Sequence, residues 1–462
     1  MTLIKSISGI RGTIGGVPSE NLTPLDAVKF AAAYGSWLRG YRKKDKLKVV
    51  IGRDARLSGP MIQQLVSATL TGLGIDIIDL GLSTTPTVEL AVPMEGADGG
   101  IILTASHNPK QWNALKLLNE RGEFLDAEQG KAILEIAEAA NFEFAPVDQL
   151  GEVVTNDAYL DIHVDEVLNL ELVDAGKIRA KKLKAVVDGV NSSGGIAIPK
   201  LLRALGVEVV ELYCDPTGHF PHNPEPLKEH LGDICNMVIE EKADLGIVVD
   251  PDVDRLAFIT EKGEMFGEEY TLVACADYVL GKTPGNTVSN LSSTRALKDV
   301  TLKHGGSYTS AAVGEVNVVA AMKETGAVIG GEGNGGIIYP ESHYGRDALV
   351  GTALFLMLLC EKGLSVSELK NTYPQYFMGK KKIELTPGLD VDSLLADMAS
   401  RYRNEEISTV DGVKIDFPKG WVHMRKSNTE PIIRVYTEAP SLEEAEDLAD
   451  RFVSEIREMA SR

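Results

Sequence analysis

The stretch KADLGIVVDPDVDR, residues 242–255, joins an apolar run to an acidic loop. Residues 245–249 follow one another without a polar break, which is typical of a strand buried on both faces of a sheet. The same plan recurs in GADGGIILTASHNP (96–109) and in TGAVIGGEGNGG (325–336). Three strands that each end in a polar loop predict several α/β domains with mainly parallel sheets.

Helical patterns fill the intervals between the strand-like runs. Apolar residues recur at three- and four-residue spacing in the segments 25–38, 58–73, 194–205 and 313–323. Open α/β sheets bind ligands outside the carboxyl ends of their strands. We expect all three polar loops to lie at such ends.

The C-terminal part of the chain has a different pattern. Charged β-like runs at 380–385, 412–416 and 432–437 accompany a helix that begins at Leu442, as expected for a small α+β domain. The 462 residues therefore predict three related α/β units and one α+β domain. The expected domains are 1–155, 156–257, 258–375 and 376–462.

Charge and cysteine content exclude several classes of partner. The formal net charge is −20, which disfavours nucleic acids and anionic membranes as partners. The four cysteines show no CxxC spacing, and the longest apolar run, 349–360, is too short to span a bilayer. These features predict a cytoplasmic protein with reduced thiols.

Asp250, Asp252 and Asp254 directly follow the predicted strand 245–249. Three neighbouring carboxylates repel one another unless a cation neutralises them, and a ligand set made only of oxygen suits Mg²⁺. An EF-hand is excluded because Arg255 stands at its sixth position, where glycine is required. The alternative is an acidic, solvated turn.

Ser106 lies in TASHNP and lacks the Gly-x-Ser-x-Gly elbow of α/β-hydrolases. His107 is not an obvious partner, because adjacent side chains on an extended chain point apart. Taken alone, Ser106 is a turn residue. Beside a Mg²⁺ loop it becomes a candidate phosphoryl carrier.

Two further loops contain groups that recognise sugars and phosphates. GEGNGG matches GxGxxG by chance, because a strand and not a helix is expected to follow it. It presents Glu332 and Asn334, which suit vicinal sugar hydroxyls, although a plain glycine turn is the alternative. RKSNTEPIIRV favours a phosphate pocket over a charged surface turn, and its candidate ligands are Arg425, Ser427, Asn428, Thr429 and Arg434.

Together, TASHNP, DPDVDR, GEGNGG and RKSNTEP resemble the α-D-phosphohexomutase superfamily, in the same order and over the whole chain. The resemblance implies four domains around a central cleft. It makes Ser106 the phosphoserine and a Mg²⁺ ligand together with the three aspartates. Arg11 and Arg255 would stabilise phosphoryl oxygens, Lys116 would assist proton transfer, and His107 joins the catalytic set. Glu332 and Asn334 would bind the sugar, and the RKSNTEP residues with Arg434 would hold its non-reacting phosphate.

The implied reaction moves a phosphoryl group between positions 1 and 6 of a hexose through a sugar bisphosphate, which also primes the enzyme. Glucosamine phosphate is the first expectation, with Glu332 and Glu315 facing the amino group. Glucose or mannose phosphate is the alternative, and a Mg²⁺-dependent sugar phosphatase or a non-catalytic phosphosugar sensor is less favoured. The expected assembly is a monomer or homodimer.

The general base stays open at this point. Gly336 and Glu315 occupy positions where many family members have histidine. Glu315, Lys116 or His343 could take that role, although His343 is otherwise expected to be a surface-loop histidine.

Overall fold

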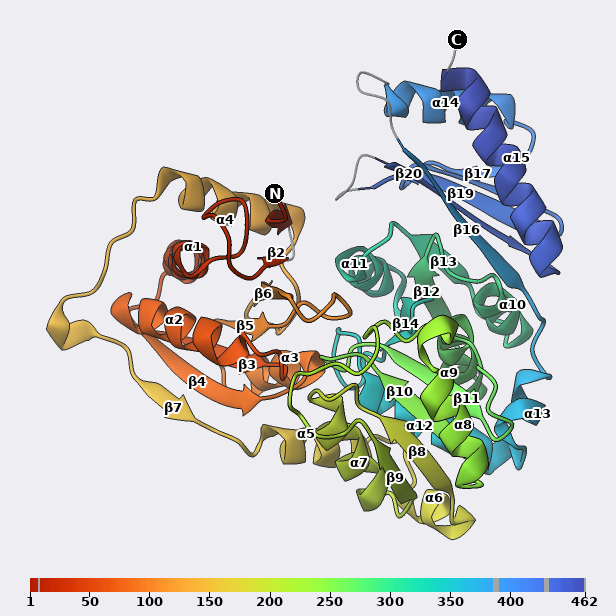
Figure 1. The fold of residues 1–462 in the computed structure, drawn as a ribbon, viewed down its shortest axis with the longest axis horizontal. Helices are drawn as coiled ribbons and strands as arrows, with labels where there is room; N and C mark the ends of the chain where they lie inside the picture. The colour runs from red at the N-terminus through yellow and green to blue at the C-terminus, as the bar shows by residue number, and fades with distance from the viewer. Residues whose placement is uncertain (7–8, 385–389, 428–431, 461–462) are drawn as a thin grey trace.

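The computed structural model describes all residues except 7–8, 385–389, 428–431 and 461–462. Its strands form four separate sheets (Figure 1). Three sheets are mixed and mainly parallel in their centres, and the fourth is antiparallel throughout. The predicted fold class of three α/β units and one α+β unit is confirmed.

The first sheet has seven strands in the order β1-β2-β6-β5-β3-β4-β7. Short apolar strands such as β5 are fully buried, because helices cover both faces of its parallel centre. The strands are β1 (Ile4–Ser6), β2 (Gly9–Thr13), β3 (Leu47–Arg53), β4 (Ile75–Leu82), β5 (Gly99–Leu103), β6 (Trp112–Leu118) and β7 (Val153–Thr155). The helices are α1 (Pro24–Arg42), α2 (Gly59–Gly72), α3 (Thr85–Met94) and α4 (Ala127–Ala139), with a 3-10 turn at Val147–Gln149.

The second sheet has four strands in the order β11-β10-β8-β9. Its strands are β8 (Lys184–Asp188), β9 (Glu208–Leu212), β10 (Leu245–Val249) and β11 (Leu256–Thr260). Its helices are α5 (Tyr159–Leu168), α6 (Ala175–Lys181), α7 (Gly194–Ala204) and α8 (Gly232–Glu240), with a 3-10 turn at Lys228–His230. Strand β10 is the expected apolar run, and it leads directly into the acidic loop.

The third sheet repeats this plan in the order β13-β12-β14-β15. Its strands are β12 (Asn286–Asn290), β13 (Tyr308–Ala311), β14 (Ala327–Glu332) and β15 (Gly336–Ile338). Its helices are α9 (Glu268–Lys282), α10 (Ala296–Lys303), α11 (Glu315–Thr325), α12 (Ala348–Lys362) and α13 (Val366–Lys370). Helix α12 is apolar all round and buried over twelve residues. No helix among the described residues is long and apolar enough to cross a membrane.

The fourth sheet has the order β16-β20-β19-β18-β17. Its strands are β16 (Phe377–Glu384), β17 (Glu406–Ser408), β18 (Val413–Phe417), β19 (Gly420–Lys426) and β20 (Ile432–Ala439), and its helices are α14 (Val391–Arg401) and α15 (Leu442–Ala460). Ser441 caps the start of α15, where its Oγ accepts from Glu444 N at 3.2 Å. The exact domain limits given above stay predictions.

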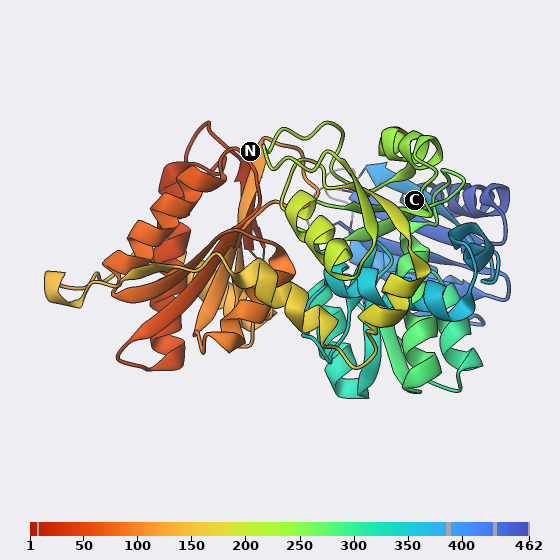
Figure 2. The same ribbon diagram turned by 90° about the horizontal axis from the view of Figure 1, so that it is seen from below.

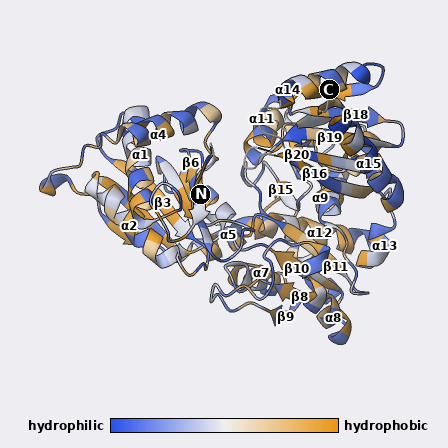
Figure 3. Cartoon of the chain, turned by 45° about the horizontal axis from the view of Figure 1, so that its top comes forward, coloured by the Kyte–Doolittle hydropathy of each residue, from blue (hydrophilic) through white to orange (hydrophobic). Residues whose placement is uncertain are grey.

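The sheets are grouped unevenly in space. Figure 2 shows the first unit on one side and the other three gathered on the other side. Figure 3 shows hydrophobic residues along the strands of the α/β sheets. One cluster of buried hydrophobic residues runs through both the second and the third unit. The first and the fourth unit each have a hydrophobic core of their own.

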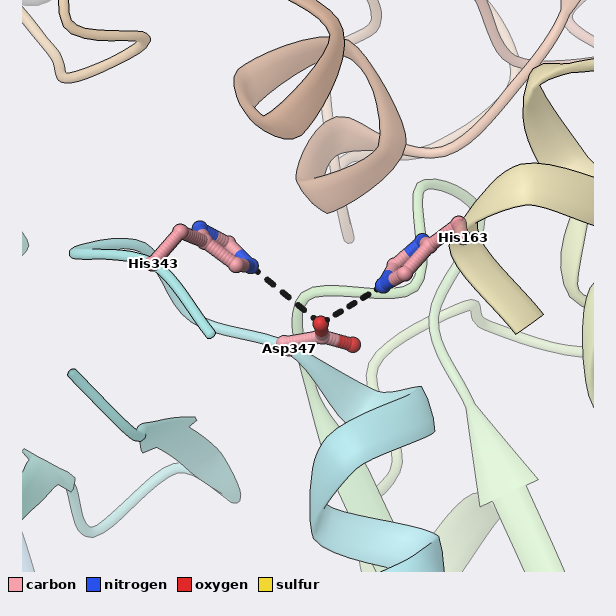
Figure 4. Close-up of side chains that lie close together, drawn as sticks. All are labelled: His163, His343 and Asp347. Atoms are coloured by element: carbon pink, nitrogen blue, oxygen red, sulfur yellow. Dashed lines mark hydrogen bonds and ion pairs between the residues drawn. The ribbon is translucent and has the colours of Figure 1, made fainter. Parts of the chain in front are cut away.

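A buried hydrogen-bonded cluster joins the first three units (Figure 4). His163 on α5 and His343 both place Nε2 on Asp347 Oδ2, at 2.8 and 3.2 Å. His163 Nδ1 contacts Thr87 Oγ1 on α3 at 2.9 Å. His343 lies in a loop, as expected, but its side chain is only 11% exposed and is hydrogen-bonded to Asp347, so it is not a solvent-facing histidine. Asp347 also caps α12, where its Oδ1 accepts from the backbone N–H of Leu349 at 2.8 Å.

We predict that His163→Ala lowers the free energy of unfolding by about 1–3 kcal/mol, because it leaves buried hydrogen-bonding groups without a partner. Urea denaturation measures this change. His304→Ala is the matched control, because His304 also bonds an aspartate, at 2.8 Å, but with a side chain that is 22% exposed. Equal losses in the two variants would contradict a special contribution of the buried cluster.

Candidate active site

Ser106 lies just beyond β5, with its backbone in the left-handed region at φ 50°. Its side chain is nearly buried, and Oγ donates to Asp250 Oδ2 at 2.8 Å. The left-handed turn also brings His107 Nδ1 to 3.3 Å from Ser106 Oγ. The expectation that these neighbours point apart is therefore wrong, because it assumed an extended chain at this position.

The three aspartates after β10 are completely buried. Asp250 Oδ1 accepts from the backbone N–H groups of Asp254 and Arg255, each at 3.2 Å, which curls the loop. One carboxylate oxygen from each aspartate lies within 4.8 Å of the others. Among the described residues, Oδ1 of Asp252 and Oδ1 of Asp254 have no hydrogen-bond partner. Buried, unpartnered carboxylate oxygens fit a hard divalent cation such as Mg²⁺.

Burial and like charge act on the pKa values of this loop. Burial raises the pKa of Asp250 well above its usual range, and the charges of Asp254 and Asp252 raise it further. Burial also penalises ionised Asp254, but the cations of Arg346 and Lys116 outweigh it and lower the pKa of that carboxyl. The negative charge of the three aspartates is therefore neutralised in part by cations from other segments of the chain.

Lys116 and Arg11 supply cations from the first unit. They stand on the paired strands β6 and β2, on one face of the sheet. Lys116 Nζ donates to Asp252 Oδ2 at 2.6 Å and lies 3.4 Å from Asp254 Oδ2. Burial lowers the pKa of Lys116, but these two carboxylates raise it above its usual value, so Lys116 is a cation here.

Arg11 and Arg255 form a second, less neutralised group of cations. Burial lowers the pKa of Arg11, and the nearby charge of Arg255 lowers it further. Arg255 pairs with Glu225 Oε1 at 3.1 Å, while its Nε finds no partner among the described residues. Guanidinium groups that repel one another beside an open cleft favour a phosphoryl group as their ligand.

Arg346, which the sequence analysis did not single out, links the acidic loop to the sugar loop. It contacts Asp254 Oδ2 at 2.6 Å, Glu332 Oε2 at 2.9 Å and Glu315 Oε2 at 2.9 Å. The only feature of the sequence that could have pointed to Arg346 is its position directly before Asp347, the residue that caps α12. Asn334 lies beside Glu332, with Nδ2 3.5 Å from Oε2.

Glu315 does not lie where the sequence analysis expected it. It faces Arg346 and lines a neighbouring cavity between the first and third units, not the main cleft. Burial raises its pKa to about 7. Glu315 therefore does not lie where it could contact the amino group of a sugar bound in the main cleft.

Arg425 on β19 and Arg434 on β20 stand directly opposite each other in the antiparallel sheet. Like charges in this position repel each other, and Asp411 Oδ2, 3.6 Å from Arg425 Nη1, offsets part of that repulsion. Ser427 is buried, and its N–H donates to Ile432 O at 2.9 Å. Asn428 and Thr429 lie outside the described residues.

A central cleft of about 250 Å³ brings these loops together. Its walls combine residues from all four units, including His107, Arg255, Glu332, Asn334, Arg425 and Arg434. Lys380, Glu268 and Glu269 also line it, although no motif marks them. Burial raises the pKa of Glu269 to about 8. A cleft with separated cationic ends and polar walls suits a sugar that carries phosphate.

Comparison with known families agrees with this architecture. Models of the phosphoglucomutase/phosphomannomutase family match in succession: alpha/beta/alpha domain I at residues 4–144, domain II at 161–263, domain III at 267–376 and the C-terminal domain at 381–455.

Individual relatives match over nearly the whole chain. A protein named "Probable phosphoglucosamine mutase" from Methanopyrus kandleri is 36% identical over 453 residues, 97% of each chain. A "Phosphoglucomutase/phosphomannomutase" from Thermococcus kodakarensis is 35% identical over 453 residues, 97% of this chain and 98% of its own. The crystal structure of a phosphoglucomutase/phosphomannomutase family protein from Burkholderia thailandensis has a TM-score of 0.85 and 28% identity, covering 98% of this chain and 97% of that one.

The order of the matched domains, the extent of the similarity and the shared fold lead to one conclusion: this chain belongs to the phosphoglucomutase/phosphomannomutase family of the α-D-phosphohexomutase superfamily, whose members are isomerases.

Proposed function

We propose that this phosphohexomutase interconverts glucosamine 6-phosphate and glucosamine 1-phosphate, with Ser106 as the phosphoryl carrier. The observation that carries the mutase chemistry is the position of Ser106 Oγ, 2.8 Å from Asp250 Oδ2 and 3.3 Å from Nδ1 of His107, which lines the cleft together with Arg425 and Arg434. One phosphate can then react at the serine while the other is held by cations from the fourth unit.

The proposed reaction consists of two phosphoryl transfers. In the first, the bond between phosphorus and Ser106 Oγ breaks, and a bond to a free hydroxyl of the sugar monophosphate forms. Burial and the charge of Arg255 lower the pKa of His107 and keep it neutral, so that it can accept the hydroxyl proton and pass it to Ser106 Oγ, 3.3 Å from its Nδ1, as that oxygen leaves the phosphorus. The resulting hexose 1,6-bisphosphate turns round and its other phosphate is transferred to Ser106 Oγ. The proton that the serine hydroxyl loses passes through His107 to the sugar oxygen that leaves the phosphorus.

Asp250, Asp252 and Asp254, with an oxygen of the serine phosphate, would hold Mg²⁺. The ion neutralises charge on the phosphoryl group when it is bound. Lys116 and Arg346 hold the acidic loop against the serine loop and the sugar loop, and Arg11 and Arg255 bind phosphoryl oxygens. Hexose 1,6-bisphosphate would also prime the enzyme by phosphorylating Ser106.

The choice of glucosamine rests on two supports. Glu268 lines the cleft together with Glu332 and can face an ammonium group, whereas Glu315 cannot serve there. The Methanopyrus kandleri relative also has the glucosamine name. Glucose or mannose phosphate is the second candidate, because the Thermococcus kodakarensis relative is nearly as similar. A cytoplasmic location and a monomeric or homodimeric state stay predictions.

We predict higher kcat/KM for glucosamine 1-phosphate than for glucose 1-phosphate or mannose 1-phosphate. Purified protein with Mg²⁺ and a trace of the matching bisphosphate gives the three values by coupled assay or by NMR. Turnover of glucosamine 1-phosphate well below the other two would remove the amino sugar from the proposal and leave a phosphoglucomutase/phosphomannomutase.

Ser106→Ala is expected to lower kcat at least about a thousandfold, because the covalent carrier is lost. Intact-protein mass should show one phosphate on the wild type after incubation with bisphosphate and none on the variant. Ser367→Ala is the control: Ser367 is a buried serine whose Oγ donates to Glu261, and neither residue lines the cleft. This variant should carry one phosphate on Ser106, as the wild type does. Retained activity in Ser106→Ala, with net release of inorganic phosphate, would favour a phosphatase.

Asp252→Asn is expected to lower kcat at least about a hundredfold at saturating Mg²⁺, because several kcal/mol of charge stabilisation depend on the metal loop. Chelation with EDTA should abolish wild-type turnover, and added Mg²⁺ should restore it. Asp244→Asn is the matched control at the opposite end of β10, where Asp244 accepts from Lys184 N at 2.7 Å. Full activity in EDTA would contradict the metal site.

A further inference from the structure

Arg56, in the loop between β3 and α2, is a fully buried arginine whose donors all find acceptors. Its Nε donates to Asp54 Oδ2 at 3.0 Å. The remaining four donors reach backbone carbonyls of the loop that contains Ser106. These acceptors are Pro109 O at 2.8 Å, Trp112 O at 2.9 Å, Asn108 O at 2.6 Å and Ser106 O.

The loop that Arg56 contacts has a conformation that needs support. Ser106 has φ 50°, a region that residues with a Cβ rarely adopt without added contacts. Thr104 contributes, since its Oγ1 accepts from Ser106 N at 3.0 Å and donates to Asp54 Oδ2 at 2.6 Å. Asp54 thus supports the loop through Thr104, and Arg56 supports it directly. One of the carbonyls that accept from Arg56 is that of Ser106 itself.

The same turn also touches the second unit near the acidic loop. The N–H of Ala55 donates to Ser192 Oγ at 3.3 Å, and that hydroxyl donates to Pro251 O at 2.7 Å. The ring of Phe220 lies over the Arg56 guanidinium, with 5.0 Å from Cζ to the ring centroid. Pro251 stands between Asp250 and Asp252. The turn at residues 54–56 therefore contacts both loops whose relative position sets the distance from Ser106 to Asp250.

We propose that Arg56 is a positioning residue that holds the reactive serine in its left-handed turn and aligns Ser106 Oγ with the acidic loop. This inference rests on the proposed role of Ser106 as phosphoryl carrier. Arg56 does not line the central cleft, so it acts through the loop. A planar guanidinium supplies five donors in a fixed fork, whereas an ammonium group supplies three from a single point. Lysine keeps the charge beside Asp54 but cannot satisfy the same set of carbonyls.

A change in loop position should appear in the chemical step and not in sugar binding. A displacement of about 1 Å at a reacting atom can cost about a hundredfold in rate. The cations assigned to the non-reacting phosphate, Arg425 and Arg434, lie on β19 and β20 and make none of these contacts. KM for the phosphosugar should therefore stay close to the wild-type value while kcat falls.

The test compares Arg56→Lys with wild type in the full-length protein. We expect kcat to fall about a hundredfold and KM to change less than about twofold. Single-turnover experiments on protein phosphorylated at Ser106 should show the same loss in the rate at which sugar phosphate removes the phosphoryl group, followed by intact-protein mass. Thermal denaturation checks that the variant is folded.

Arg39→Lys is the matched control. Arg39 lies in the same unit and also donates to backbone carbonyls, of Glu143 and Leu73, but it is remote from the serine loop. It should keep wild-type kcat. If Arg56→Lys does not fold, the double variant Asp54→Asn with Arg56→Gln removes both buried charges together and should show the same fall in kcat.

The outcomes separate this inference from the proposed function. Wild-type protein that neither isomerises phosphosugars nor accepts phosphate on Ser106 would overturn the proposed function and with it the role of Arg56. Active wild type together with an Arg56→Lys variant of equal kcat and equal transfer rate would overturn the positioning role alone. A variant with unchanged kcat but a raised KM would also contradict it, since that result indicates a role in sugar binding.

Discussion

The arrangement of the first three units depends on the need to neutralise three buried carboxylates. Asp250, Asp252 and Asp254 repel one another at the end of one strand, in surroundings without solvent. The nearest cations come from other units: Lys116 from the first and Arg346 from the third. Charge neutralisation of this loop therefore takes groups from three sheets, and a bound divalent ion would add to it.

The first three units are joined by buried contacts, and the fourth has a hydrophobic core of its own. The first three units share buried contacts, such as the hydrogen bonds of Asp347 with His163 and His343, and the second and third also share a hydrophobic core. The fourth unit has its own core cluster and offers paired arginines to the cleft. Buried contacts therefore join the reactive loops, while the residues proposed for the distant phosphate stand on a separate sheet.

Several individual residues mark the limit of sequence reasoning. Ser106 and the aspartates were predicted because they directly follow apolar runs, and strand ends are recognisable locally. Arg56 and Arg346 have no such signal, because nearly all their partners, Asp54 apart, are backbone carbonyls and carboxylates 14 to 92 residues away. The contact between His107 and Ser106 was mispredicted for a related reason: the left-handed turn at Ser106 depends on contacts from distant segments.

The sequence by itself determined the fold class and the chemical types in each loop, since hydrophobic periodicity and short polar motifs are local properties of the chain. The resemblance of four motifs in order also identified the superfamily. Only the tertiary structure decided which groups meet: that Glu315 lies behind Arg346, that Glu268 and Glu269 enter the cleft, and that Arg56 supports the serine turn. Such contacts depend on how separate sheets pack, and packing geometry is not encoded in any one segment.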